Sequence, residues 1–445
     1  MIPQVIHIGG EHSVTGSCHL LRSQGLNIMV DCGSAQGSAT VLPINQWPVK
    51  PAEIDYLFVT HVHIDHIGRL PELLTAGFHG EILCSHPSKA LLRPMLEDSL
   101  RFEEYDKHQT DSLLASIERT SHGFDYGKRC KLKNGVEFTL GQAGHILGSC
   151  FIHLFFPGIP SAIPGNSCYS IIFSGDLGSK NTPLLPDPDA PESCDLLFLE
   201  STYGDRLHHD REHRLEKLSS VLRQALADKG KVFIPAFALG RTQELLYEID
   251  RLKATDHSAS GDLANIPVFI DSPLGLKITA IYSSLSRFWD NEAKKLLAAG
   301  DQPIDFANLY SSVSFHDHQK LLEIPGPAII IAGSGMCTGG RILDHLSTGL
   351  SDPRNDILFV GYQAKNTIGR AIIDQSATNG KGSVTIAGRQ ITVKAKVHVM
   401  PGYSAHADQQ GLVDWVKSMP QPPKEIRLVH GEEAAQRELW NKLAE

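Results

Sequence analysis

The sequence predicts an α/β protein in which one domain is inserted into another. Up to about residue 205, short apolar strands alternate with glycine-rich turns, whereas from residue 231 continuous apolar runs alternate with helix-compatible stretches. The second pattern is typical of βαβ units and therefore of a parallel, Rossmann-like sheet. The third observation is a run of metal-binding residue types at 61–66, which is too small to close a two-metal site and needs ligands from later segments.

The first region is expected to contain strands joined by turns, with two helices between them. The helices are expected at Ser88–Gln109 and Asp111–Thr120, and the stretch 156–168, rich in Pro, Gly and Ser, is expected as an inserted loop. The strands are expected at 5–9, 27–31, 56–60, 82–85, 169–174 and 195–200.

Apolar runs of buried-strand length characterise the second region, and a helix-compatible stretch follows each of the first three. They begin at Lys231, Pro267, Pro327 and Asp356. After about residue 390 comes a strand pattern, then a helix at Asp408–Ser418 and a strand at Glu425–Val429. The predicted division is therefore a metal-binding domain of residues 1–205 and 391–445 with an insert of residues 206–390, whose second boundary falls between about 370 and 395.

Four metal-binding side chains lie within six positions, directly after the apolar segment 56–60: His61, His63, Asp65 and His66. Neutral imidazole suits zinc, and a carboxylate can bridge or complete a two-metal site. Because alternate side chains of an extended stretch share a face, His61 and His63 can bind one ion together. Asp65 and His66 lie past the strand end and can turn towards a second ion. The run predicts metal-assisted chemistry.

Three later residues are candidates for the missing ligands. His145 lies in Ala-Gly-His-Ile-Leu-Gly-Ser, where glycines let the backbone approach an ion closely. Asp176 ends a strand-like segment, where a carboxylate is well placed to bridge two cations. His430 closes Ile-Arg-Leu-Val-His near the C-terminus. Since His430 must return to a site built before residue 180, the C-terminal segment is expected to rejoin the first domain.

The order of these residues resembles the motif series of the metallo-β-lactamase fold: Asp31, the 61–66 run, His145 and Asp176. Three further stretches resemble the extra motifs of the β-CASP nucleases: Leu199-Glu-Ser-Thr-Tyr-Gly-Asp, Gly402-Tyr-Ser-Ala-His-Ala-Asp and Leu428-Val-His-Gly-Glu. Others are typical of the RNA-processing members: Val14-Thr-Gly-Ser, Gly333-Ser-Gly-Met-Cys-Thr-Gly-Gly-Arg and Gly361-Tyr-Gln-Ala. The resemblance spans about residues 5–435. It implies a two-piece αββα sandwich with a β-CASP domain between the pieces and an active site in the cleft between domains.

The resemblance also implies two Zn²⁺ ions per chain and a role for each matching residue. His61, His63 and His145 are expected to hold one ion, Asp65, His66 and His430 the other, and Asp176 to bridge them. Asp31 is expected to buttress a ligand histidine.

The implied reaction is hydrolysis of RNA phosphodiester bonds, chiefly as an endonuclease. Two dications lower the pKa of a shared water to about 7, and the resulting hydroxide attacks phosphorus in line. His406 is the expected general acid, because imidazole titrates near working pH. Glu200 is expected to orient His406 and keep it protonated. Asp65 is counted as a catalytic residue as well as a ligand.

Four residues are candidates for contacts with RNA, although structural roles suit the same sequence contexts. Arg241 begins a helix after a strand, where the helix N-terminus and the guanidinium both suit phosphate. Ser334 lies in Gly333-Ser-Gly-Met, whose backbone amides can approach a phosphate closely. Lys365 and Ser404 can touch the scissile strand.

Composition limits the remaining possibilities. An apolar content of 41% and a charged content of 20% are ordinary for a globular protein. No apolar stretch reaches the roughly 20 residues of a membrane span, and the N-terminus lacks the pattern of a signal peptide. The eight cysteines are scattered singly, which favours reduced thiols and a cytoplasmic location. Because the net charge is −9 and RNA is an anion, any RNA contact is expected to come from a few local residues and not from a broad basic surface. The sequence leaves a homodimer open.

Other functions are expected to fit the sequence less well. A thioester or lactam hydrolase needs neither the inserted domain nor His406, and DNA nucleases of the family usually carry valine where His430 stands. A scaffold without metals is disfavoured because every ligand position is intact. A 5′–3′ exoribonuclease of the same family remains the alternative to an endonuclease.

Overall fold

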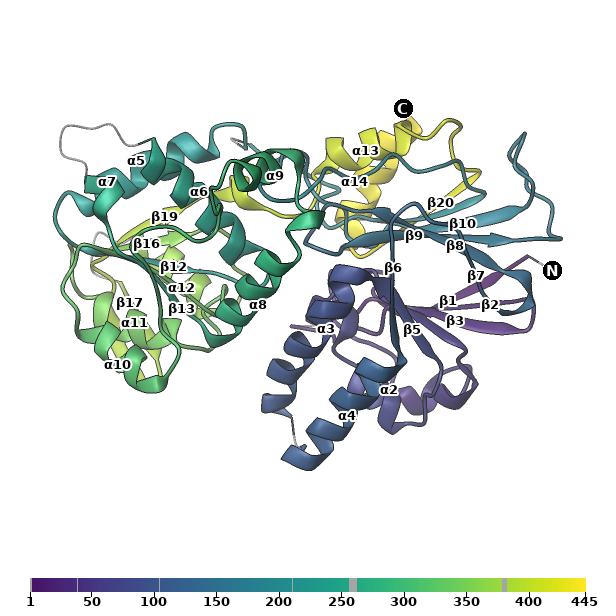
Figure 1. Cartoon of the computed structure of the whole chain (residues 1–445), viewed down its shortest axis with the longest axis horizontal. Helices are drawn as coiled ribbons and strands as arrows, with labels where there is room; N and C mark the ends of the chain where they lie inside the picture. The colour runs from purple at the N-terminus through teal and green to yellow at the C-terminus, as the bar shows by residue number, and fades with distance from the viewer. Residues whose placement is uncertain (1, 38, 104, 210, 256–261, 378–381) are drawn as a thin grey trace. The chain divides into compact units, whose positions relative to one another are not determined.

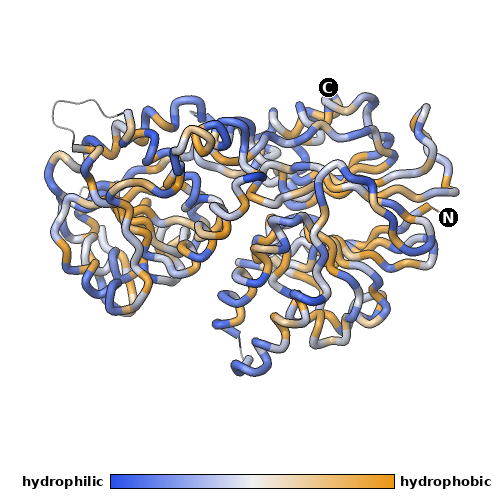
Figure 2. Tube along the Cα trace, in the orientation of Figure 1, coloured by the Kyte–Doolittle hydropathy of each residue, from blue (hydrophilic) through white to orange (hydrophobic). Residues whose placement is uncertain are grey.

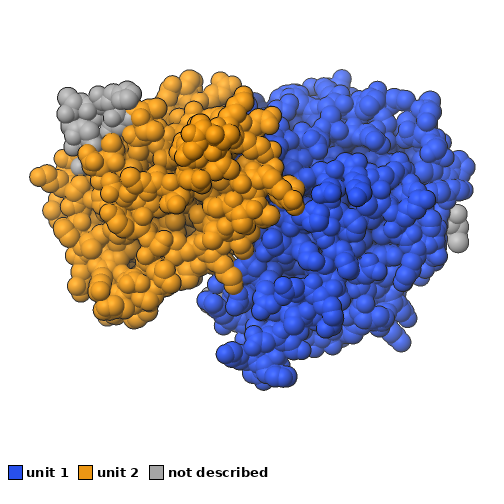
Figure 3. Space-filling view, in the orientation of Figure 1, with its two compact units in different colours: residues 1–207, 406–445 blue, residues 208–405 orange. Residues whose placement is uncertain are grey.

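The computed structural model describes all residues except 1, 38, 104, 210, 256–261 and 378–381 (Figure 1). The chain divides into two compact units, unit 1 of residues 1–207 and 406–445 and unit 2 of residues 208–405 (Figure 3). Unit 1 is thus built from two sequence pieces with unit 2 inserted between them. The chain returns at residue 406 rather than at 391, because β19 (Lys396–Val399) still pairs in parallel with β16 (Asp356–Phe359) of unit 2.

Unit 1 contains a six-stranded sheet, sheet 1, in the order β1-β2-β3-β4-β5-β6. Its strands are β1 Gln4–Gly9, β2 Cys18–Ser23, β3 Leu26–Val30, β4 Tyr56–Phe58, β5 Glu81–Ser85 and β6 Ser121–Phe124. The first three strands pair antiparallel, and the pairs from β3 to β6 are parallel. Residues that follow β4 therefore leave the sheet at the same edge as those that follow β3 and β5.

A second six-stranded sheet of unit 1, sheet 2, has the order β20-β11-β10-β9-β8-β7. Its strands are β7 Cys130–Lys131, β8 Glu137–Gln142, β9 Cys150–Phe156, β10 Tyr169–Phe173, β11 Leu196–Glu200 and β20 Glu425–Val429. Strands β10, β11 and β20 run parallel, and Glu200 lies opposite Val429. This pairing joins the C-terminal piece to the first piece and sets His430 beside the end of β11.

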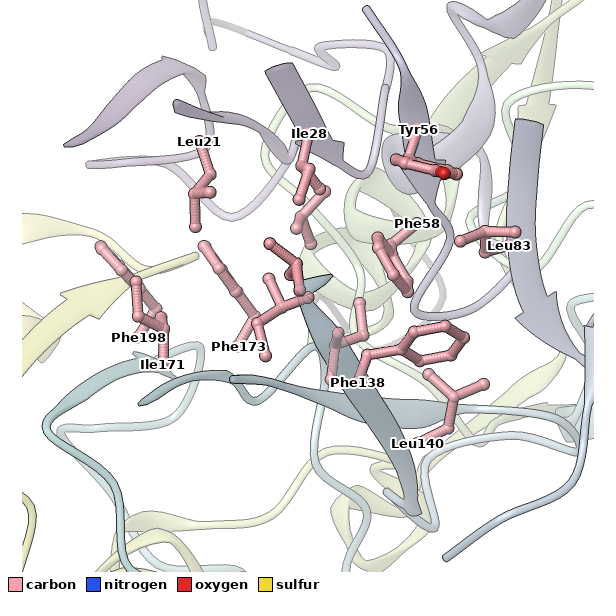
Figure 4. Packing of buried hydrophobic residues seen from close by; sticks show 14 of the residues in the cluster. Leu21, Ile28, Tyr56, Phe58, Leu83, Phe138, Leu140, Ile171, Phe173 and Phe198 are labelled. Atoms are coloured by element: carbon pink, nitrogen blue, oxygen red, sulfur yellow. The ribbon is translucent and has the colours of Figure 1, made fainter. Parts of the chain in front are cut away.

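The main core of unit 1 lies between its two sheets. Figure 4 shows Ile28 and Phe58 of sheet 1 pointing towards Phe138 and Phe173 of sheet 2, and all four are almost fully buried. Because successive strand residues face opposite sides, Ile172 points the other way and packs with helix residues on the outer face of sheet 2. Helices thus cover the outer faces, giving the four layers αββα (Figure 1).

The helices of unit 1 lie on both sides of this sandwich, with α3 and α4 beside β5 and with α13 and α14 beside sheet 2. They are α1 Ile64–Ile67, α2 Leu70–Thr75, α3 His86–Ser99, α4 Lys107–Thr120, α13 Gln409–Lys417 and α14 Glu433–Ala444. Short 3₁₀ turns of this unit are Ile44–Gln46, Pro51–Glu53, Leu100–Phe102 and Lys133–Gly135.

Unit 2 contains a parallel six-stranded sheet, sheet 3, in the order β14-β13-β15-β12-β16-β19, as the apolar runs predict. Its remaining strands are β12 Lys231–Pro235, β13 Val268–Asp271, β14 Leu309–Ser311 and β15 Ala328–Ala332. A separate hairpin consists of β17 Ser383–Ile386 and β18 Arg389–Thr392. Hydrophobic residues are concentrated in the interior of each unit in Figure 2, and all five residues of β15 are buried, as a strand covered on both faces requires.

Helices cover sheet 3 between its strands. Helices α10, α11 and α12 contribute residues to the large apolar cluster of unit 2. Helix α5 contacts β12, and helix α8 contacts β13. The helices are α5 Arg214–Leu226, α6 Arg241–Ala254, α7 Asp262–Asn265, α8 Pro273–Ser284, α9 Asn291–Ala298, α10 Phe315–Glu323, α11 Ile342–Gly349 and α12 Ile368–Ser376. Two 3₁₀ turns are Ser286–Phe288 and Pro401–Tyr403.

The structure corrects the first two expected helices. The first ends at Ser99 rather than at Gln109, and the second begins at Lys107 rather than at Asp111. The cause is a capping box: the Asp106 carboxylate accepts from Gln109 N at 2.8 Å, and Gln109 Oε1 accepts from Asp106 N at 2.9 Å. Within the described residues, no helix combines the length and apolar character needed to cross a bilayer.

Candidate metal centre

The first trio of candidate ligands comprises His61, His63 and His145. His61 and His63 follow β4, and His145 lies in the connection between β8 and β9. His63 Nδ1 lies 3.1 Å from His61 Nε2 and 3.2 Å from His145 Nε2. With an Asp176 oxygen, the ligand atoms of this trio all lie within 4.8 Å of one another. The alternation expected of an extended segment therefore directs His61 and His63 to a common point.

The second trio comprises Asp65, His66 and His430. Asp65 and His66 lie on the short helix α1, and His430 directly follows β20. His430 Nε2 is 3.2 Å from His66 Nε2 and 3.5 Å from Asp65 Oδ2. The C-terminal piece thus brings its histidine to helix α1, which carries the other two side chains.

Asp176 lies between the two trios and presents a different oxygen to each. Its Oδ2 is 3.5 Å from His61 Nε2 and 3.7 Å from His145 Nε2. Its Oδ1 is 3.4 Å from His66 Nε2 and 3.5 Å from His430 Nδ1. This is the arrangement that a carboxylate bridging two cations adopts.

The spacing and the unsatisfied atoms of this cluster fit bound metal ions. Zinc–nitrogen bonds of about 2.0–2.1 Å at tetrahedral angles separate ligand nitrogens by about 3.4 Å, close to the contacts within each trio. Asp176 Oδ1 is buried and accepts no hydrogen bond from the described residues, although a buried carboxylate oxygen normally has a partner. Burial lowers the pKa of His63 to about 4 and holds those of His61 and His145 well below their usual value, which keeps these imidazoles in the neutral form that binds metal.

Asp31 orients His66 from behind. Its Oδ2 lies 2.7 Å from His66 Nδ1, so the other ring nitrogen, Nε2, points to Asp176. Thr60 holds the Asp31 carboxylate through its backbone N–H at 2.8 Å and its hydroxyl at 2.9 Å. Burial opposes a charge on His66, but the carboxylates of Asp176, Asp31 and Asp65 outweigh it and raise the pKa of His66 well above its usual value. The pocket therefore attracts positive charge, which a proton or a metal ion can supply.

Two threonines were not expected in the centre. Thr60 supports Asp31, and the hydroxyl of Thr202 lies 3.1 Å from His430 Nδ1. Each threonine follows a strand: Thr60 directly precedes the 61–66 run, and Thr202 lies within Leu199-Glu-Ser-Thr-Tyr-Gly-Asp. This position beside a motif is the signal that the sequence contains. Sequence reasoning identified the histidines and carboxylates by their chemistry, whereas these hydroxyls act through contacts visible in the fold.

His406 and Glu200 form a pair beside the first trio. Glu200 ends β11 and is fully buried, and its Oε1 accepts from Leu177 N at 2.7 Å and lies 3.2 Å from His406 Nδ1. The His406 side chain is 20% exposed, whereas His61, His66 and His145 are exposed by 1% or less. Burial alone would lower the pKa of His406, but Glu200 and Asp176 outweigh it and raise this pKa to about 9.

The glycines around His145 serve chain packing rather than close approach to an ion. A Cβ on Gly144 would lie 2.9 Å from Pro188 Cδ, and one on Gly148 would lie 2.6 Å from Ser88 N. Both glycines also have positive φ, which side-chain-bearing residues rarely adopt. They let the loop turn and pack tightly, and that packing positions His145.

The four candidate RNA contacts lie in unit 2 and differ in accessibility. Arg241 begins α6 as predicted, but its guanidinium is buried, pairs with Glu244 and lies over the ring of Tyr403. The Ser334 hydroxyl accepts from Thr338 N at 2.9 Å and so closes its own loop. Lys365 is exposed, and Ser404 is half-buried.

A further His and Asp cluster in unit 2 is an ion-pair network. Asp271 Oδ2 lies 2.6 Å from a nitrogen of both His318 and His345, and Asp271 Oδ1 accepts from Arg341 Nη1 at 2.8 Å. A metal ion would have to displace hydrogen bonds and lie beside a guanidinium. The cluster instead joins β13 to α10 and α11.

Comparison with known families matches almost the entire chain. The model of the metallo-beta-lactamase superfamily matches residues 14–236, and that of the Beta-Casp domain matches residues 242–372. The model described as a Zn-dependent metallo-hydrolase RNA specificity domain matches residues 390–445. Its match begins ahead of the return to unit 1 at residue 406, and includes most of β18 and all of β19 of unit 2.

Similar proteins come from bacteria, archaea and animals. Ribonuclease TTHA0252 of Thermus thermophilus is 33% identical over 97% of this chain and 93% of its own length. Transcription termination factor FttA of Methanocaldococcus jannaschii is 29% identical over 97% of this chain and 67% of its own. Cleavage and polyadenylation specificity factor 73 of Drosophila melanogaster is 30% identical over 97% of this chain and 60% of its own.

Among solved structures, a protein of unknown function from Enterococcus faecalis V583 has a TM-score of 0.54, with 11% identity over 96% of this chain and 93% of its own. At that identity the likeness concerns the fold alone. The superfamily model spans half of the chain, and the bacterial relative aligns over nearly its whole length. The chain therefore belongs to the metallo-β-lactamase superfamily, among its β-CASP ribonucleases, and is a metal-dependent nuclease.

Proposed function

We propose that this protein is a zinc-dependent ribonuclease that cuts RNA internally and binds two Zn²⁺ ions per chain. The observation that carries the proposal is the position of Asp176, whose two oxygens face different ligand trios. A single-ion centre would not require a buried carboxylate to present both oxygens to separate sets of ligands. RNA as the substrate is supported by the match to an RNA specificity domain and by the names of the relatives.

We assign the ligands as two sets joined by Asp176. His61, His63 and His145 would hold the first ion, and Asp65, His66 and His430 the second. When bound, two divalent cations supply Lewis acidity towards a phosphodiester and lower the pKa of a water between them. Asp31 would fix the ring of His66, since metal-ligating histidines usually give their second nitrogen to such a carboxylate.

His406 is assigned as the general acid. Its Nδ1 is engaged by Glu200, so Nε2 is the nitrogen that would protonate the departing ribose oxygen. The carboxylates of Glu200 and Asp176 favour the protonated ring, which is the form that an acid needs. Because the His406 side chain is partly exposed, a substrate can reach it, whereas most of the ligand histidines are buried.

Several finer points belong to the same proposal. Among the predicted RNA contacts, Lys365 is exposed and Ser404 is half-buried two residues before His406, so we keep both as substrate contacts. The polar groups of Arg241 and Ser334 are already bound to other residues of unit 2, so these two residues would shape the segments that contact RNA and would not bind it directly. None of the eight cysteines is in a disulfide, which supports a cytoplasmic location. Homodimerisation stays a prediction.

The test is incubation of the purified protein with RNA labelled separately at each end, with and without a chelator. Internal cuts give intermediate-length products from both labels, and these should vanish with chelator and return with added zinc. The control is His63→Ala purified identically, which excludes a contaminating nuclease. Release of mononucleotides from the 5′ end would assign the 5′–3′ exonuclease instead, and cleavage that persists in chelator would contradict the proposal.

A further inference from the structure

Two aromatic side chains are exposed near the carboxyl edge of sheet 3 in unit 2. Phe237 follows β12 and is 43% exposed, and Tyr362 follows β16 and is 60% exposed. Large aromatic side chains are usually buried for much of their surface. These two come from neighbouring parallel strands, at the edge where ligands of open α/β sheets bind.

The loops that carry Phe237 and Tyr362 both contact the loop that follows β15. Strands β12 and β16 pair in parallel with Phe233 opposite Ile357, so the loops that carry Phe237 and Tyr362 leave neighbouring strands at the same edge. A Cβ on Gly335 would lie 2.8 Å from Phe237 Cδ2, which means that this loop packs against the ring. Gln363 Nε2 in turn donates to Gly335 O at 2.9 Å. The three loops therefore form one cluster.

The charge of this cluster differs from that of the whole chain. Residues 236–241, 333–341 and 361–367 contain no Asp or Glu, although the chain has a net charge of −9. They contain three basic residues: Arg241 and Arg341 pair with Glu244 and Asp271, whereas Lys365 is exposed on the same loop as Tyr362. An edge that combines exposed aromatic rings with an exposed lysine is complementary to a polyanion that carries flat apolar groups.

We propose that Phe237 and Tyr362 form a stacking platform for unpaired bases of single-stranded RNA. The proposal rests on the proposed function, because it takes RNA as the substrate. Protein aromatic rings stack on bases that are not paired, irrespective of base type, and each stack strengthens binding by roughly ten-fold or more. A base-paired duplex hides these faces, so the platform selects single-stranded segments without reading their sequence.

The test is RNA binding in a His406→Ala background, in which the RNA survives, followed by fluorescence anisotropy with an unstructured oligonucleotide. Phe237→Leu and Tyr362→Leu keep apolar bulk but remove the aromatic face, and each should weaken binding about ten-fold. Phe237→Tyr and Tyr362→Phe should bind like the parent. Tyr310→Leu is the matched control, because Tyr310 is a 48% exposed aromatic residue elsewhere in sheet 3.

An oligonucleotide with an intact sugar–phosphate chain but abasic sites separates stacking from other effects. It should bind the parent and both leucine variants equally, and duplex RNA should also show no difference. Leucine variants that bind the normal oligonucleotide like the parent would overturn the platform while the chain still cuts RNA. Equal losses on the abasic chain would also overturn it, since the rings would then act on loop structure. A protein with His406 intact that neither binds nor cuts RNA would refute the proposed function itself.

Discussion

At the scale of single residues, Asp176 is the side chain on which both candidate ions depend. Asp176→Ala removes an oxygen from each trio, so the zinc content should fall from about two ions per chain to less than one. Asp65→Ala should remove the second ion only, because Asp65 belongs to one trio. Elemental analysis after dialysis against trace chelator measures both. An unchanged load in Asp176→Ala, or equal losses in the two variants, would contradict the bridging assignment.

His406 should be separable from the ligands by chemistry. His406→Ala is expected to retain its metal and its RNA affinity while the cleavage rate falls roughly 10²–10⁴-fold, the usual contribution of a positioned acid. A substrate whose departing ribose oxygen is replaced by sulfur needs no proton on leaving, so it should restore much of the lost rate. Rates of single-turnover cleavage measure the rescue.

The control for this rescue is His430→Ala. It should lose zinc from the second trio and stay inactive on the sulfur substrate, assayed with a matched thiophilic metal. Metal loss in His406→Ala, or equal rescue of both variants, would reassign His406 as a ligand.

The candidate ligands of the centre could be predicted from the sequence, whereas the residues that hydrogen-bond to them and hold them in place could not. Imidazoles and carboxylates within six positions reveal their chemistry by type and spacing, and the seven candidate ligands do converge in the fold. Thr60 and Thr202 are common surface residue types, so their type carries no such information. Their hydrogen bonds to Asp31 and His430 exist only once strands distant in sequence are paired.

At the scale of elements, helix α1 depends on its close approach to the loop after β3. A Cβ on Gly33 would lie 1.6 Å from Asp65 O, so Gly33→Ala must displace α1 and the two ligands that it carries. We expect a loss of stability of about 1–3 kcal/mol or more, as for overpacked sites, together with weaker zinc binding. Thermal unfolding and chelator competition measure these effects. Gly361→Ala, which has nothing within 4 Å of its new Cβ, is the control and should change neither.

The junction of β13 with α10 and α11 should make unit 2 sensitive to acid. Burial opposes the ionised form of Asp271, but hydrogen bonds from His345, His318, Ser312 and Arg341 outweigh it and hold the pKa of Asp271 well below its usual value. A depressed carboxyl pKa stabilises the fold above the unfolded value of about 3.9, and this contribution is lost as the pH falls below it.

Asp271→Asn should therefore be less stable than the parent at neutral pH, and the difference should narrow on acidification from about pH 6 to about pH 3. Urea unfolding, followed by hydrogen exchange of peptides from residues 208–405, measures the midpoint of unit 2. A difference that is constant over this range would show that the ionised carboxylate is not the stabilising form.

Element predictions succeeded where one signal dominated. The continuous apolar runs of β12, β13, β15 and β16 were recognised, because strands buried on both faces have no competing pattern. Strand β9 was missed although all seven of its residues are buried, since it directly follows the loop of His145. The predicted boundary between α3 and α4 is wrong, because the residues around Asp106 are compatible with a helix interior whereas Asp106 caps the start of α4.

At the scale of the whole molecule, metal removal should act on one unit. Every candidate ligand lies in unit 1, so bound ions stabilise that unit, as any ligand does that binds only the folded form. Chelation should accelerate amide exchange in peptides from 1–207 and 406–445 and leave those from 208–405 unchanged. Exchange mass spectrometry of the metal-loaded and chelated protein makes the comparison, and uniform acceleration in both units would refute this expectation.

The division of the fold into units could be inferred from the return of His430, whereas the exact return point could not. The sequence after residue 390 contains strands of both units in succession, β19 pairing with β16 and β20 pairing with β11. Local pattern describes a strand but not its partner. Partner choice depends on the whole sheet, and so the position of the boundary emerges only in the fold.

The two-piece construction of unit 1 also orders events during biosynthesis. A ribosome delivers the chain from its N-terminus, so the first trio is complete once residue 145 has emerged, whereas the second waits for residue 430. Strand β20, which carries this last histidine into place, is synthesised after the entire inserted unit. Until residue 430 has emerged, the nascent chain lacks one candidate ligand of the second trio. Any activity that needs both candidate ions can therefore begin only after β20 has been made and paired with β11.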